Sequence, residues 1–404
     1  MSARVALRRR RRVRAGATQL FGLLAGVGLG VALPRIEGGP TVPAAPVVEL
    51  VLALGLGLLG AIVLIFSLLF LVVQWAATTF TPRLTLFRDA PIVWRTFAVT
   101  IGLVVFSLTA ALATGGRREV SAAVPGCELV LLLVLAVMLR ALQLRAFAAI
   151  QLPLVLGSIS RRGRAILDAL YPRPDTPVEV KETAPAAGLP AHRSTVAWPD
   201  PPAVLQQVDT GRLRAAARAA DAVVVVRHSP GTTLRRGAAV ADVHGGALPD
   251  GAVLDCLVVG RERTFEQDPT LAFRLLADIA LRALSPAVND PATAVQAMDD
   301  LEDLLGQPAA VPPEPLSVGD ADGTVRVVVR LPDWEDVLRS TVDDLVVAAL
   351  PSPMALARVR SMLHHLLELA HADHREQVAR RLALVEDGQS ALLPRVWQEP
   401  RREP

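Results

Sequence analysis

Four apolar stretches fill most of the first 165 residues, and only the last of them contains a charged residue, Glu128. About 20 apolar residues are enough for an α-helix to cross the hydrocarbon core of a bilayer. The first stretch lacks the small-residue cleavage site of a signal peptide, so we interpret it as a helix too. The pattern predicts four transmembrane helices over Ala15–Pro34, Leu50–Pro82, Thr96–Gly116 and Ser121–Leu139.

The arginines between these stretches predict the orientation of the helices. Seven arginines precede the first stretch, and others lie around Arg88 and from Arg140 to Arg164, whereas the two opposite loops are short and carry fewer. Short loops rich in Lys and Arg remain on the cytoplasmic side of a membrane. The pattern therefore predicts a multi-pass protein of the bacterial inner membrane with both termini in the cytoplasm.

Charge divides the 404-residue chain into two parts. Residues 1–165 carry 18 arginines and five acidic residues, and the remainder carries 24 basic and 34 acidic residues. The positive charge lies beside apolar stretches rather than on a folded basic face, which favours the lipid bilayer as a partner and disfavours nucleic acid. The two cysteines, Cys127 and Cys256, are too few for a disulfide framework and are expected on opposite sides of the membrane.

After the apolar stretches, the chain changes to a pattern typical of a soluble α+β domain. Residues 166–202 include a segment rich in proline and alanine, which predicts a linker rather than a core element. Residues 203–260 contain a short predicted helix over 209–221 and short apolar runs between glycine turns. We expect a small β half-barrel with strands over 222–226, 238–243 and 253–259, to which 324–331 can add a further strand.

Residues 261–393 show helical periodicity. Apolar residues recur at helical spacing after Asp268-Pro269 and again after Asp290-Pro291, and each Asp-Pro pair is typical of a helix start. Two further helices are predicted over 334–350 and 353–371, and residues 394–404 form a polar tail. The predicted fold class is thus a four-helix membrane region, residues 1–165, followed by an α+β cytoplasmic domain with a helical C-terminal part.

Two motifs in this helical part resemble a known family. Residues 263–268 read RTFEQD and residues 283–294 read ALSPAVNDPATA. They resemble the bacterial family of predicted membrane proteins called domain of unknown function 2254, as does FTPR at residues 80–83 with Arg88-Asp89 after it. The resemblance covers roughly residues 47–390 and implies an architecture rather than an activity. Ala287 stands where the family usually has glycine, which argues against a positive φ at that residue.

Polar residues concentrate in this helical hairpin and form a candidate site. A ligand or ion site would need two helix amino termini and two arginines to converge, because such groups favour anions. Alternatively, Asp268 and Asp290 cap their helices, while Asp278 pairs with Arg274 and Arg282 four residues away. The polar corner comprises Arg263, Glu266, Gln267, Asp268, Asp278, Arg282, Ser285, Asn289 and Asp290.

The chain lacks the sequence motifs of common catalytic sites. No phosphate-binding loop, HExxH motif, GxSxG motif or Cys-His nucleophile pair occurs, and we expect neither a catalytic residue nor a cofactor. Histidines 364, 365, 371 and 374 match no established zinc spacing, so we interpret them as a solvated face or a helix end.

Two hypotheses of function follow. The first is a membrane protein that assembles with copies of itself and whose cytoplasmic domain senses or gates. The alternative is a membrane-tethered enzyme or ligand-binding protein that acts at the polar corner.

Overall fold

The computed structural model describes residues 3–36, 39–79, 91–171, 188–312, 315–320 and 322–392. By its internal contacts the chain forms two compact units, residues 5–155 and the part from Leu156 onward. The expected arginine loop at residues 80–90, much of the expected linker and the polar tail lie outside the described residues.

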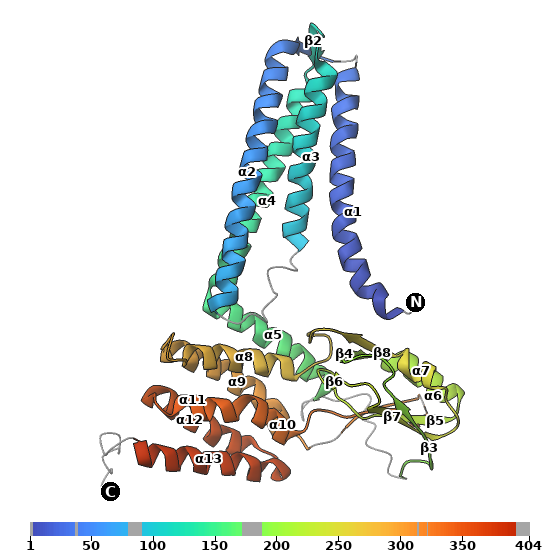
Figure 1. The fold of residues 1–404 in the computed structure, drawn as a ribbon, viewed down its shortest axis with the longest axis vertical. Helices are drawn as coiled ribbons and strands as arrows, with labels where there is room; N and C mark the ends of the chain where they lie inside the picture. Colours follow the sequence, from blue (N-terminus) through green and yellow to red (C-terminus); the bar gives the residue numbers. More distant parts are fainter. Residues whose placement is uncertain are drawn as a thin grey trace. The chain divides into compact units, whose positions relative to one another are not determined.

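The first unit consists of four long helices, which Figure 1 shows running lengthwise. They are α1 (Ala3–Ala32), α2 (Ala44–Thr79), α3 (Pro91–Thr114) and α4 (Ala123–Ile150). A 3₁₀ turn, η1 (Leu33–Arg35), follows α1, and β1 (Thr41–Pro43) pairs antiparallel with β2 (Glu119–Ser121). Each long helix contains a stretch long and apolar enough to cross a membrane, which confirms the prediction of four long apolar helices.

Small residues set the distance between α1 and α3. A Cβ added at Gly22 would lie 2.4 Å from the Ala98 carbonyl oxygen, and one added at Gly26 would lie 2.3 Å from that of Gly102. Spacing of small residues by four places them on one helix face, where they let two helix backbones approach closely in a membrane. Gly30, four residues further on, lies against Thr109 in the same way.

Strands of the second unit form two open sheets rather than the single half-barrel that we expected. The five-stranded sheet has the order β3 (His192–Ala197), β7 (Ala239–Gly245), β5 (Ala222–Val226), β10 (Val325–Val329), β9 (Leu316–Gly319). Only the β5–β10 pair in it is parallel. The three-stranded sheet has the order β6 (Thr233–Leu234), β4 (Ala203–Val208), β8 (Leu257–Gly260). The half-barrel fails because the predicted strands belong to different sheets.

Two expectations about single strands are wrong: the linker contains a strand, and the strand expected over 253–259 begins with a helical turn. Strand β3 lies inside the expected linker, where its residues other than Val196 are not buried, so its apolar signal is weak. Residues 250–254 form one helical turn, α7 (Asp250–Leu254), before β8 begins at Leu257. A short apolar run cannot be assigned to helix or strand by periodicity alone. The predicted helix over 209–221 is confirmed as α6 (Thr210–Ala219), with Asp209 as its cap.

The remaining helices of the second unit gather at the opposite side from the strands (Figure 1). They are α8 (Thr270–Ala283), α9 (Pro291–Ala310), α10 (Trp334–Leu338), α11 (Asp344–Ala349), α12 (Pro353–Leu369) and α13 (Ala372–Leu392). A π-helical turn, η2 (Arg339–Asp343), joins α10 to α11, so the helix predicted over 334–350 is not uniform. Helix α13 was not predicted as a separate helix.

Helix α5 (Leu152–Leu170) begins one residue after α4 ends. Gln151 between them has an extended backbone, and Pro153 follows in the first turn of α5. The first residues of a helix tolerate proline because their N–H groups have no partner within the helix. The chain therefore turns at Gln151 with no linker, and from Leu156 onward α5 belongs to the second unit.

The close approach of α1 and α3 predicts how alanine substitutions at two glycines of α1 change the stability of the first unit. Gly26→Ala should lower the stability of the first unit by about 1–3 kcal/mol, the usual cost of overpacking, because the new methyl group meets the Gly102 carbonyl. Gly28→Ala is the matched control, since nothing lies within 4 Å of a Cβ there. Thermal unfolding of the detergent-solubilised chain measures both variants, and equal stability of the two would contradict the packing described.

Candidate functional site

The polar corner contains a buried ion pair at the start of α8. Arg263 donates to both carboxylate oxygens of Asp268, from Nε at 2.6 Å and from a terminal nitrogen at 2.7 Å. The Asp268 side chain is 0% exposed and also accepts from the backbone N–H of Thr270 at 3.1 Å. Asp268 thus accepts from the first N–H of α8 from one position before the N-cap, Pro269, and the bidentate contact with Arg263 was not expected.

The loop before α8 is held against β4 and a neighbouring turn. The Gln267 side chain accepts from the backbone N–H of Val208 and donates to its carbonyl, at 2.9 and 3.1 Å. Gly231 has a φ of 98°, and a Cβ there would lie 2.5 Å from an Asp268 carboxylate oxygen. The carboxylate is therefore covered by backbone, which leaves no space beside it for a ligand. Glu266, by contrast, is exposed.

The second motif forms the turn between α8 and α9. Asp290 caps α9, accepting from the Thr293 N–H at 3.1 Å and from the Thr293 hydroxyl at 2.6 Å. Ser285 donates its hydroxyl to the Arg282 carbonyl at 2.7 Å. The turn has its positive φ, 50°, at Asn289 and not at Ala287, as the alanine there predicted. Asparagine tolerates this left-handed conformation better than most residues.

Hydrogen bonds at the α9 cap affect the ionisation of Asp290. Its pKa is lowered, first by the hydrogen bond from the Thr293 hydroxyl and then by that from the Thr293 N–H. A carboxylate with a lowered pKa in the folded state stabilises the fold above the usual Asp pKa. That contribution is lost as the pH falls through the folded value.

The two halves of the polar corner do not converge. Arg263, Gln267 and Asp268 lie at the start of α8, whereas Ser285, Asn289 and Asp290 follow its end. Fourteen residues of α-helix separate them by about 21 Å at 1.5 Å per residue. Asp278 in between pairs with Arg274 at 2.8 Å, which confirms one of its two predicted partners. The Nε of Arg282, the other predicted partner, is buried without a hydrogen bond among the described residues. We expected the amino termini of α8 and α9 to meet, and this expectation is wrong. The amino terminus of α9 follows the carboxyl end of α8, a whole helix away from the amino terminus of α8.

Helix α5 docks on the α8–α9 hairpin, a contact that the sequence did not reveal. The Ser160 hydroxyl donates to Asp300 at 2.6 Å, and Arg164 forms an ion pair with Asp303. Between these contacts, a Cβ at Gly163 would lie 2.6 Å from the Ala272 methyl and 2.9 Å from Leu304. The absence of a side chain at residue 163 is what lets the three helices meet.

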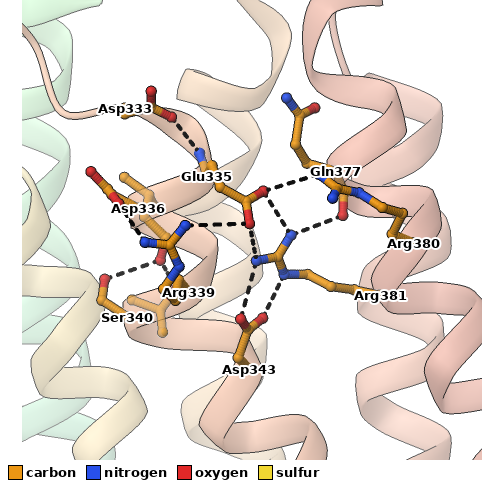
Figure 2. A network of polar contacts seen from close by, with 11 residues as sticks. Asp333, Glu335, Asp336, Arg339, Ser340, Asp343, Gln377, Arg380 and Arg381 are labelled. Atoms are coloured by element: carbon orange, nitrogen blue, oxygen red, sulfur yellow. Dashed lines mark hydrogen bonds and ion pairs between the residues drawn. The ribbon is translucent and has the colours of Figure 1, made fainter.

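A second polar network ties α13 to α10 and η2 (Figure 2). The Arg381 guanidinium, with its side chain 7% exposed, bridges the carboxylates of Glu335 and Asp343. Asp343 follows Glu335 by slightly more than two α-helical turns, which take about 7.2 residues. The π-helical turn η2 is wider and accommodates the additional residue, so that both carboxylates face Arg381. The pKa of Glu335 is lowered, chiefly by its hydrogen bonds from Arg381.

The four histidines near the C-terminal helices have separate partners. His364 lies 3.5 Å from Glu386, His365 pairs with Glu302, and His371 lies 3.4 Å from Asp373. His374 stacks on Trp334 and contacts the Ala309 carbonyl oxygen at 3.1 Å. In the part of the chain that the structure describes, no three His, Cys, Asp or Glu side chains are placed to hold a metal ion.

The two capping aspartates should respond differently to loss of charge. Asp290→Asn should have little effect, because asparagine caps a helix about as well as aspartate, whereas Asp290→Ala should cost about 0.5–2 kcal/mol. Asp268→Asn should cost more than Asp290→Asn, on the order of 1.5–3 kcal/mol, because it removes charged hydrogen bonds to Arg263. Thermal unfolding of the full chain compares them, and equal losses for the two Asn variants would contradict this assignment.

Comparisons with known proteins agree with the architecture. The profile of a family described as "Predicted membrane protein (DUF2254)" matches residues 18–365. Uncharacterized proteins of Mycobacterium bovis and Mycobacterium tuberculosis are 31% identical over 261 residues, which is 59% of this chain and 48% of each relative. The chain thus spans about half the length of the curated relatives that it matches. No solved structure matches the chain. With four apolar helices followed by an α+β unit, the chain belongs to the DUF2254 family of predicted membrane proteins, whose function is unknown.

Proposed function

We propose that this protein is a self-assembling protein of the bacterial inner membrane, in which the second unit, in the cytoplasm, senses a condition there and gates the first unit. The observation that carries this proposal is that α5 begins in the first unit and continues into the second. It follows α4 after the single residue Gln151, and from Leu156 it is packed into the second unit. A helix that shifts on the α8–α9 hairpin would pull directly on the last apolar helix.

The packing of the four apolar helices supports assembly from several chains. Half of the α3 span is buried, but only 11% of the α2 span and 17% of the α1 and α4 spans are. Buried apolar residues of α2, α3 and α4, including Val51, Phe106 and Leu135, form a common core. Among the described residues, buried apolar side chains fill the centre of this bundle, whereas most of the α1, α2 and α4 spans is not buried. We therefore place any gated path between copies, along the exposed apolar faces.

The alternative, a ligand-binding or catalytic function at the polar corner, has weaker support. Asp268 already has Arg263 and Thr270 as partners and no exposed surface, and Asp290 bonds to its own helix. Capping and pairing account for these carboxylates without a ligand.

The proposed orientation can be tested in intact cells. Two exposed positions, Arg118 between α3 and α4 and Arg236 between β6 and β7, are each replaced by cysteine in a Cys127→Ala chain. Cys256 can remain because it is 3% exposed. A membrane-impermeant thiol reagent should label Arg118→Cys directly and Arg236→Cys only after permeabilisation, since arginine-rich loops stay inside. Labelling of Arg236→Cys in intact cells would contradict the proposed orientation.

The proposed assembly predicts the mass of the purified protein. Native mass spectrometry of the full chain, released from detergent or lipid nanodiscs, should give a multiple of the chain mass. The species should persist on dilution, because close van der Waals packing between the helix faces would hold the copies together. A strict monomer under both conditions would remove the proposed path between copies.

A further inference from the structure

Among the described residues of the four apolar helices, Glu128 is the buried carboxylate. It lies in the second turn of α4 and is 1% exposed, within the apolar core shared by α2, α3 and α4. Its Oε1 lies 2.8 Å from the hydroxyl of Ser107 on α3, and its Oε2 has no hydrogen-bond partner. An ionisable residue in such a place is costly unless it is paired, and it is commonly functional.

The hydrogen bonds of Ser107 show which form of Glu128 fits. The Ser107 hydroxyl lies 2.8 Å from the Leu103 carbonyl oxygen and 2.8 Å from Glu128 Oε1. A serine has one hydroxyl proton, and a carbonyl or an ionised carboxylate can only accept. When the Ser107 proton points to the Leu103 carbonyl, the contact with Glu128 is a full hydrogen bond if Glu128 carries a proton on Oε1 and donates it to Ser107. An ionised Glu128 would instead have to share the single Ser107 proton with Leu103.

We propose that Glu128 is a reversible proton-binding site of the first unit. In the binding step, a hydronium ion transfers a proton to the carboxylate Oε1, an O–H bond forms, and water leaves. The Ser107 hydroxyl then turns from the carboxylate to the Leu103 carbonyl. Release reverses both changes. Gly55 of α2 leaves room for Ser107, because a Cβ there would lie 2.9 Å from the Ser107 Cβ.

A second buried hydroxyl lies on the same helix as Ser107, at the end of α3. Thr114, seven residues after Ser107, is 1% exposed, and its hydroxyl has no hydrogen-bond partner. Seven residues are close to two helical turns, so both hydroxyls lie on one face of α3. Gly115 and Gly116, which follow, are exposed. Water that enters at this end of α3 would meet Thr114 first and Glu128 next.

A proton fits this site better than a metal cation does. Hard cations take six or more oxygen ligands, as calcium and magnesium do, whereas the described partner of Glu128 is a single hydroxyl. Among the described residues, the titratable groups on the elements nearest in the fold are Cys127, which adjoins Glu128 on α4, and the exposed Glu49 on α2 and Glu119 on β2. Helix α3 has no charged residue between Arg95 and its end at Thr114.

Infrared difference spectroscopy of the full chain in lipid nanodiscs tests this site. At neutral pH the wild type should show the C=O band of a protonated carboxylic acid, and the band should disappear as the pH is raised. Glu128→Gln should lack the band while it keeps a similar shape and one acceptor. The matched control, Glu119→Gln, removes an exposed carboxylate that accepts from Thr41, and should leave the band unchanged.

A second variant keeps the test decisive if Glu128→Gln does not fold. Ser107→Ala should keep the carboxylic acid band but shift its frequency, because the acid loses its hydrogen-bond acceptor. Three results would overturn the proposal: no protonated-acid band that depends on Glu128, a band insensitive to Ser107→Ala, or loss of the band on adding sodium ions at constant pH.

Discussion

The docking of α5 on the α8–α9 hairpin is the contact on which the rest of the account depends. It relies on a missing side chain, because Gly163 lies where a methyl group would overlap Ala272 and Leu304. The hydrogen bond between Ser160 and Asp300 fixes the register beside it. Close packing in protein interiors leaves few voids, so a contact of this kind has one preferred arrangement. The helix that follows the last apolar span is thereby an integral part of the second unit.

Polar contacts within the second unit have structural roles that their position in the fold explains. Asp268 and Gln267 fasten the start of α8 to Arg263 and to β4, and Asp290 begins α9. Arg381 holds α13 to Glu335 and Asp343 across two helices. Breaking a buried pair by removing one partner is costly, because the other charge remains unpaired. Asp268 and Asp290 fix the starts of α8 and α9, the two helices on which α5 docks, through hydrogen bonds within the protein.

Local signals in the sequence were sufficient for some of these features and not for others. The cap at Asp290 and the four apolar spans could be predicted, because each depends on neighbouring residues. The contact of Gln267 with Val208 spans 59 residues, and that of Arg381 with Glu335 spans 46. No periodicity links such residues. The arginines from Arg161 to Arg164 indicated a cytoplasmic segment, but nothing local shows that Gly163 contacts Leu304. The polar corner was predicted as one site because its two motifs are close in sequence, while the helix between them keeps them apart.

Hydrogen exchange of the full chain in lipid nanodiscs, followed by mass spectrometry, tests most directly whether α5 connects the two units. Gly163→Ala should loosen the docked helix, and Gly157→Ala is a control on the same helix, with only Arg161 at 3.5 Å from its added Cβ. The account predicts faster exchange for Gly163→Ala in α8 and α9 and also in the last turns of α4, with no change for the control. Faster exchange confined to α8 and α9, with α4 unchanged, would contradict the proposed coupling.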